Sequence, residues 1–305
     1  MNTGWTNFCT MSIVHFMAFP STIGGEGPIV ETVKKIAEDP FFGAIEVGWI
    51  KDNKVREEVK AIIAASHLKV GYAAQSAQLL QKLNINSLDE NERKKAIDQL
   101  KACVDEAFEI GAQRVAFLSG KDPGDADRPK AFNLLVDSVK SICAYAQDKG
   151  IAMTLETFDR SIDKKCIIGP SDYAAEFTKI IRKDYADFGL LYDLSHMPLL
   201  FESPETSLKL LKDYLVHIHV GNGVVDPNQA GYGDLHPRFG WPGGKNDVPE
   251  LTGFLKMLFD IGYLSADKSS KPWIGFEVKP QIASETPELV IAGTKRVWQD
   301  AWANI

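Results

Sequence analysis

Short apolar runs alternate with longer segments of helical periodicity along the whole chain. Eight of these runs are rich in β-branched and aromatic residues, which predicts strands, and each is followed by a candidate helix. The predicted strands are residues 12–19, 44–50, 69–74, 114–119, 151–156, 188–193, 216–220 and 273–278. Regular alternation of strand and helix is typical of parallel βαβ units.

The segment after the third predicted strand shows the helical pattern clearly. Ile97, Leu100, Val104 and Phe108 recur at steps of three to four residues and form one apolar stripe. Gly111 follows the stripe and predicts the end of the helix just before the fourth strand.

Eight strand-helix units without a long linker predict a single-domain (β/α)8 TIM barrel over residues 1–305. An open doubly wound sheet is the alternative. However, the loop after the first predicted strand reads STIGGEG and lacks the GxGxxG spacing of a dinucleotide-binding turn.

Composition and charge argue against several classes of binding partner. The chain has 45% hydrophobic and 25% charged residues, and its net charge of −7 argues against a nucleic-acid partner. Its four cysteines form no CxxC pair, which suits a reducing cytoplasm. No run approaches the about 20 apolar residues that span a bilayer, so we expect a cytoplasmic protein without a membrane partner.

Ionisable side chains stand at the ends of the last four predicted strands. Because side chains alternate between the two faces of a strand, Glu156, Asp193, His219 and Glu277 are all expected to point into the barrel near its C-terminal rim. Active sites of this fold are built on that rim.

Three carboxylates that converge within a few ångströms repel one another unless a cation lies between them. One imidazole with three carboxylates is a hard, oxygen-rich ligand set. It predicts one divalent metal ion, with Mn²⁺, Mg²⁺ or Co²⁺ preferred over Zn²⁺. The alternative is that each acid separately caps a helix or pairs with a base, but four consecutive strands with this ending favour a shared ion.

Further polar residues are expected to contact the substrate. Lys279 lies one step beyond Glu277, and Glu46 on the second predicted strand is expected to line the substrate cavity.

The connection at residues 221–246 is longer than a usual structureless loop, which favours a binding or covering role. It supplies Asp234, His236 and Arg238 to hold the hydroxyl and carbonyl groups of a carbohydrate. The alternative is a solvated loop whose Asp and His side chains hydrogen-bond its own turns.

The glutamate that ends the fifth strand, YDLSH at 192–196, HIH at 217–219 and FEVKP at 276–280 together resemble the xylose isomerase-like barrels. This superfamily includes ketose 3-epimerases, hydroxypyruvate isomerases, inosose dehydratases and a family of abasic-site endonucleases. The resemblance implies that Glu156, Asp193, His219 and Glu277 hold one divalent ion. It also implies that His196 contacts the substrate, and that Glu156 and Glu277 exchange protons with it.

GYGDLHPRFG resembles the Asp-x-His element of the endonuclease branch, which implies a further zinc on Asp234, His236 and His196. That branch also places histidines after its third and fourth strands, whereas this chain has AAQS and LSG there, so we do not expect a trinuclear cluster. The long loop also resembles the barrel subunits of bacterial C-glycoside deglycosidases.

The main functional hypothesis is a metal-dependent isomerase or epimerase that acts on a sugar or sugar derivative through an enediolate. The alternative is a metal-dependent lyase or dehydratase of an oxidised (3-oxo) sugar, polyol or C-glycoside. An abasic-site nuclease and a non-catalytic sugar-binding barrel are two further interpretations. We expect a small carbohydrate as the partner. Exposed apolar residues near Trp241 and Phe239 are candidate contacts for a homo-oligomer, and the alternative is that these aromatic side chains stack on the sugar.

Overall fold

The computed structural model describes residues 4–267 and 270–305. In this part of the chain, eight parallel strands form one sheet in the order β1-β8-β7-β6-β5-β4-β3-β2. The strands are β1 (Thr10–Ile13), β2 (Ala44–Val47), β3 (Lys69–Ala73), β4 (Arg114–Leu118), β5 (Ala152–Glu156), β6 (Gly189–Asp193), β7 (Leu215–Val220) and β8 (Trp273–Phe276). A parallel bridge between Val14 and Glu46 joins the two ends of this sheet. The sheet therefore closes into the predicted (β/α)8 barrel, and the open-sheet alternative is wrong.

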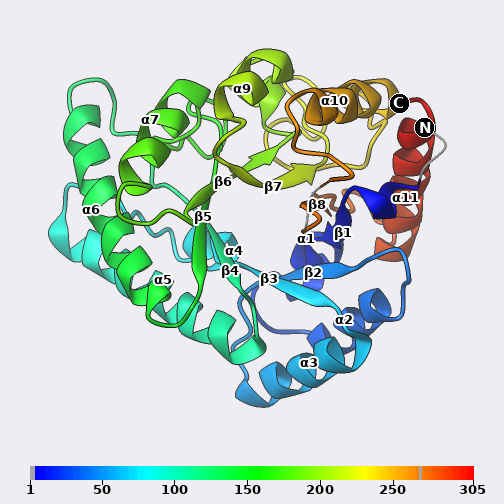
Figure 1. Cartoon of the computed structure of the whole chain (residues 1–305), viewed down its shortest axis with the longest axis horizontal. Helices are drawn as coiled ribbons and strands as arrows, with labels where there is room; N and C mark the ends of the chain where they lie inside the picture. The colour runs from blue at the N-terminus through cyan, green and yellow to red at the C-terminus, as the bar shows by residue number, and fades with distance from the viewer. Residues whose placement is uncertain (1–3, 268–269) are drawn as a thin grey trace.

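Helices follow the strands, and the longer ones form a ring outside the barrel (Figure 1). They are α1 (His15–Ala18), α2 (Ile29–Ala37), α3 (Asn53–Ser66), α4 (Gln75–Leu80), α5 (Glu90–Ile110), α6 (Arg128–Gln147), α7 (Ser171–Ile181), α8 (Met197–Leu200), α9 (Pro204–Leu211), α10 (Val248–Asp260) and α11 (Pro287–Ala303). Helix α5 ends as predicted, because Gly111 adopts a left-handed backbone with φ 84°. None of the helices in the described residues is long and apolar enough to cross a lipid bilayer.

Five predicted strands extend past the C-terminal ends that the structure shows: the third and fourth by one residue, the eighth by two, the second by three and the first by six. The first was predicted over residues 12–19, but the strand covers Thr10–Ile13 and the next residues form helix α1. Both parts are buried, so an apolar run does not distinguish strand from helix there. The eighth ends at Phe276, and Glu277 directly follows it while its backbone N–H still donates to the carbonyl of Val220 at 3.0 Å.

The apolar core lies between the strands and the helices. The outward-facing side chains of the central strands are fully buried there, including Phe117, Leu155, Tyr192 and Phe276. Burying each such side chain contributes about 1.5–3 kcal/mol, which explains why the strand runs are apolar at alternate positions.

The inside of the barrel is not filled with bulky apolar side chains, as it is in many TIM barrels. Inward-facing positions carry glycine, as at Gly71 and Gly275, or polar side chains, as at Thr154 and His217. They leave a cavity of about 950 Å³ at the N-terminal end of the strands. The polar interior continues upward to the C-terminal rim, where the strand-end acids stand.

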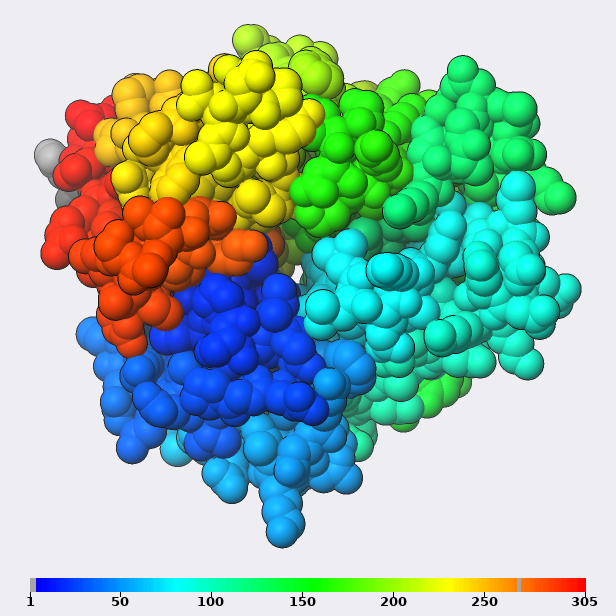
Figure 2. Space-filling model, turned by 180° about the vertical axis from the view of Figure 1, so that it is seen from behind, coloured from blue at the N-terminus to red at the C-terminus, as the bar shows by residue number. Residues whose placement is uncertain are grey.

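Figure 2 shows the face that carries the loops after the strands. The long loop after β7, in yellow, lies beside the orange segment after β8 and the green segment after β5, and these loops surround a central hollow.

Candidate active site

The four predicted metal ligands come together at the C-terminal rim. One ligand atom from each of Glu156, Asp193, His219 and Glu277 lies within 4.8 Å of the others. Glu156 and Asp193 are the last residues of β5 and β6, His219 is the penultimate residue of β7, and Glu277 follows β8. Their side chains are buried, with between 0% and 11% of their surface exposed.

His219 lies in the middle of this group. Its Nδ1 is 2.7 Å from Glu277 Oε2 and 3.8 Å from Glu156 Oε1. The register explains the arrangement, because Asp193 on β6 and Gly275 on β8 both pair with His219. A glycine at 275 leaves room for the imidazole between the two glutamates, since a Cβ there would lie 2.7 Å from the His219 ring.

Several buried polar atoms of the site make no hydrogen bond. Glu156 Oε1 and Asp193 Oδ2 accept none, although both atoms are fully inside the protein. Buried polar atoms are normally paired, so these two oxygens are suited to a cation or a proton as their partner. The donor set of three carboxylates and one imidazole suits a divalent ion, and the residues present therefore fit the predicted metal.

Without a cation, the surroundings shift the pKa values of Glu156 and Glu277 in opposite directions. Burial, together with the nearby charge of Glu277, raises the pKa of Glu156 to about 8. Burial also disfavours ionised Glu277, but His236 and His219 outweigh it and lower its pKa to about 2. Burial would lower the pKa of His219, but Glu46 and Glu277 raise it well above its usual value. A divalent ion at this point favours the ionised form of all the carboxylates.

A second group of possible ligands adjoins the first. Asp193, His196 and His236 form it, and Asp234 completes the cluster. His196 Nε2 lies 3.0 Å and His236 Nε2 2.8 Å from Asp234 Oδ1, yet neither His196 Nε2 nor Asp234 Oδ1 makes a hydrogen bond. Atoms that are close but not aligned with one another are arranged like ligands that point at a common centre.

The surroundings fix both histidines. His196 Nδ1 donates to the carbonyl of Thr157 at 2.7 Å, which leaves Nε2 to face Asp234. His236 has a positive φ of 51°, which is uncommon for a residue with a side chain, and its carbonyl accepts from the backbone N–H of Lys279 at 2.7 Å. The long loop thus turns sharply to deliver His236 to the site.

The sequence did not reveal two residues that hold site carboxylates. Gln75, the first residue of α4 and two positions after the end of β3, donates from Nε2 to Glu156 Oε2 at 2.7 Å. Lys164 lies 3.0 Å from Asp234 Oδ2 and is largely buried. A polar residue directly after the third predicted strand was the available signal for Gln75, whereas Lys164 lies in an irregular loop that gave none.

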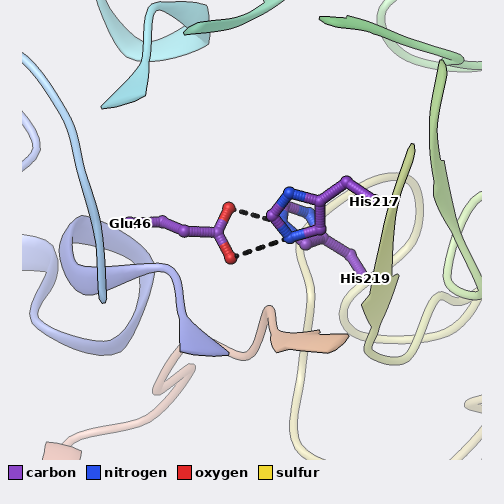
Figure 3. A group of neighbouring side chains, drawn as sticks. All are labelled: Glu46, His217 and His219. Atoms are coloured by element: carbon purple, nitrogen blue, oxygen red, sulfur yellow. Dashed lines mark hydrogen bonds and ion pairs between the residues drawn. The ribbon is translucent and has the colours of Figure 1, made fainter. Parts of the chain in front are cut away.

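The other three residues that were predicted to contact the substrate lie in different surroundings. Lys279 is half-buried beside the site, and in the described residues its ammonium forms no ion pair; burial and the charge of Lys164 lower its pKa. Glu46 faces His217 and His219 instead of the rim (Figure 3). Arg238 bonds Glu285 at 3.0 Å and the carbonyl oxygens of residues 239 and 240.

Phe239 and Trp241, near which an oligomer contact was predicted, do not form one exposed aromatic surface. Phe239 is buried with 5% of its surface exposed, so the expectation that it is exposed is wrong. Trp241 is partly exposed, and its indole N–H donates to the carbonyl of Ala230 at 2.8 Å.

The solved structures that share this fold include several sugar epimerases. A D-psicose 3-epimerase from Clostridium cellulolyticum H10 is 17% identical over 96% of this chain and 91% of its own, with a TM-score of 0.65. An L-ribulose 3-epimerase is 14% identical over 97% and 95%, with a TM-score of 0.73. A 3-keto-D-glucoside 4-epimerase from E. coli is 17% identical over 90% and 95%, with a TM-score of 0.64. At these identities the likeness concerns the fold.

A search of curated protein sequences found no match. The family model for the xylose isomerase-like TIM barrel matches residues 35–292, from helix α2 to helix α11. This match spans seven of the eight strands and every residue of the candidate site. The chain belongs to the xylose isomerase-like TIM barrel family.

Proposed function

We propose that this protein is a divalent-metal-dependent epimerase or isomerase of a sugar or sugar derivative. The observation that carries the proposal is the placement of two glutamates around one buried centre. Glu156 comes from β5 and Glu277 from the end of β8, with the ligands of β6 and β7 between them. The fold shared with several sugar epimerases supports the same reaction class.

The two glutamates are assigned the proton transfers. Gln75 holds Glu156 through Oε2 and leaves Oε1 directed at the centre, while His219 holds Glu277 through Oε2. One carboxylate removes the carbon-bound proton and the other returns a proton to the opposite face of the substrate. When bound, the divalent ion supplies a Lewis acid that stabilises the negative charge of the developing enediolate.

The remaining site residues are proposed to hold the substrate. The Lys279 ammonium offers three donors beside the centre, and His196 and His236 offer ring nitrogens that Asp234 orients. A polyhydroxylated substrate needs such donors and acceptors around its reacting carbons. Arg238 is proposed to reach a substrate only by leaving Glu285, so its replacement should affect KM more than kcat.

The proposal is tested by isotope exchange. The protein, supplied with Mn²⁺ or Co²⁺, is incubated with a panel of ketoses in deuterated water, and epimer formation and deuterium uptake are followed by NMR. Glu156→Gln should lose at least about 100-fold in rate. The matched control is Glu106→Gln, which changes a buried carboxylate far from the site. Retained exchange in Glu156→Gln would refute the assigned role.

A lyase that acts on a 3-oxo sugar or 3-oxo-glycoside is the second candidate. The shared fold with a 3-keto-D-glucoside 4-epimerase favours an oxidised sugar as substrate. The His196–Asp234–His236 group also lies beside the proton-transfer centre, where it can assist the departure of a leaving group. Incubation with 3-oxo-glycosides separates the candidates: aglycone release or water loss supports the lyase, and epimer formation supports the first proposal.

An abasic-site nuclease receives less support. The stretch AAQS at the end of β3 contains no histidine, and its Gln75 hydrogen-bonds Glu156. The net charge of −7 also opposes DNA binding. Elemental analysis of the purified protein is expected to give one divalent ion per chain. Two ions would add the Asp193–His196–His236 group, three zinc ions would support the nuclease, and none would favour a non-catalytic sugar binder.

A further inference from the structure

The acid of β2 has a different environment from the strand-end acids. Glu46 extends across the barrel interior from β2 to the two histidines of β7, and both of its oxygens face them (Figure 3). Glu46 Oε2 lies 2.8 Å from His219 Nε2, and Glu46 Oε1 lies 3.1 Å from His217 Nε2. Only 3% of the Glu46 surface is exposed, so the side chain is enclosed by these partners.

This contact determines which nitrogen of His219 faces the site. A carboxylate only accepts hydrogen bonds, so Nε2 of His219 must carry the proton that it shares with Glu46. Nδ1 is then the nitrogen directed at Glu277 and Glu156, at 2.7 Å and 3.8 Å. With Nε2 turned to Glu46, Nδ1 is the nitrogen that remains on the side of the proposed ligands.

Two neighbours hold Glu46 itself in place. The Ser12 hydroxyl donates to Glu46 Oε1 at 2.6 Å, and His217 Nε2, which makes no hydrogen bond, lies 3.1 Å from the same oxygen. The His217 ring also lies edge-on to the His219 ring, with centroids 4.8 Å apart. Gly275 makes space for this packing, because a Cβ at that position would lie 2.4 Å from Glu46 Oε1. These contacts come from β1, β2, β7 and β8, so the position of Glu46 is set by four strands of the barrel.

We infer that Glu46 is a positioning residue, held by Ser12 and His217, that orients the His219 ring so that Nδ1 is its ligand atom for the site metal. This role replaces the substrate contact expected from the sequence, because Glu46 lies on the opposite side of His219 from Glu277. The inference rests on the proposed metal-dependent function and deepens it. Carboxylates that accept from a ligating histidine raise its basicity and fix its orientation.

A different role is conceivable for the same residues, because Glu46, His217 and His219 could themselves hold a metal ion. The contacts favour positioning. Glu46 Oε1 already accepts from Ser12, and His219 Nε2 already donates to Glu46 Oε2. An ion at this place would also require His219 to bind metals through both nitrogens at once. The metal content of the variants separates the two roles.

The test measures metal affinity on the full chain. Co²⁺ and Mn²⁺ are titrated by calorimetry into chelator-treated wild type, Glu46→Gln, Glu46→Ala and the control Glu106→Gln, and the visible absorption of bound Co²⁺ is recorded. We expect Glu46→Ala to weaken binding about 10- to 100-fold and to change the Co²⁺ spectrum. Glu46→Gln keeps one acceptor oxygen and should lose less, and Glu106→Gln should match wild type.

A variant that leaves Glu46 itself intact guards against a folding artefact. Gly275→Ala moves Glu46 and His219 by steric contact, and we expect it to weaken Co²⁺ binding as well, while circular dichroism verifies the fold of each variant. Unchanged Co²⁺ affinity and spectrum in a folded Glu46→Ala would overturn the positioning role, and a raised KM alone would restore the substrate contact. A metal count that falls from two to one in Glu46→Ala would instead establish a metal site on Glu46. Wild type that binds no metal overturns the proposed function as well, so the two failures are distinguishable.

Discussion

Glu156 and Glu277 are both proposed ligands and proton carriers, yet the metal-free protein should respond in opposite ways when each is replaced by glutamine. Glutamine has nearly the same shape and keeps an acceptor for Gln75, so the change mainly removes a charge. Burial and Glu277 raise the pKa of Glu156 from 4.5 to about 8. A raised native pKa stabilises the protein below the unfolded pKa, and this contribution is lost as the pH rises to about 8.

The magnitude follows from the two pKa values. Ionising Glu156 above pH 8 costs the metal-free protein up to about 5 kcal/mol, a cost that Glu156→Gln avoids. The contribution of Glu277 to the free energy of unfolding depends on pH in the opposite direction. Its pKa falls from 4.5 to about 2, so its charge contributes up to about 3 kcal/mol above pH 4.5, and this contribution is lost as the pH falls to about 2. Glu277→Gln lacks this stabilisation at neutral pH.

Urea unfolding of chelator-treated protein at pH 5 and pH 9 measures both effects. Glu156→Gln should be more stable than wild type at pH 9 and close to it at pH 5. Glu277→Gln should be less stable than wild type at both values. With metal added, both variants should lose affinity, because each lacks a charged ligand. If Glu156→Gln destabilises the metal-free protein at pH 9 as much as Glu277→Gln does, the proposed electrostatics of the site are incorrect.

Three further predictions concern the stability of the fold and of the loops that carry the site. Burial raises the pKa of Glu106 to about 7, so its contribution to stability is present below pH 4.5 and is lost as the pH rises through about 7. Glu106→Gln still accepts a hydrogen bond from the Ile50 N–H. This variant should flatten the pH dependence of the free energy of unfolding in urea between these two pH values. Asn222→Ala removes three hydrogen bonds to the backbone of the long loop and should cost about 2–4 kcal/mol, with faster proteolysis of that loop. Lys164→Met leaves Asp234 without its buried cation and should cost about 3 kcal/mol in urea unfolding, whereas an unchanged value would show that the pair is not structural.

The fold and the convergence of the four strand-end residues could be predicted from the sequence because both depend on local periodicity. Alternation along each strand places Glu156 and Asp193 on the inner face, and the parallel connections bring the strand ends to one rim. The same local argument failed after Ile13. The run at residues 12–19 is buried on all sides, including its polar residues Ser12 and His15, so no exposed polar positions reveal its period and it fitted a strand although the chain turns into helix α1.

Only the tertiary structure decided which polar groups pair with one another. Glu46 meets His219 across 173 positions of sequence, and Gln75 meets Glu156 across 81, so neither pairing leaves a trace in any local pattern. The same holds for Arg238, which the long loop carries to Glu285. Strand periodicity specifies the face on which a side chain lies, whereas its hydrogen-bond partner depends on strand register and on loops that the closed barrel brings together.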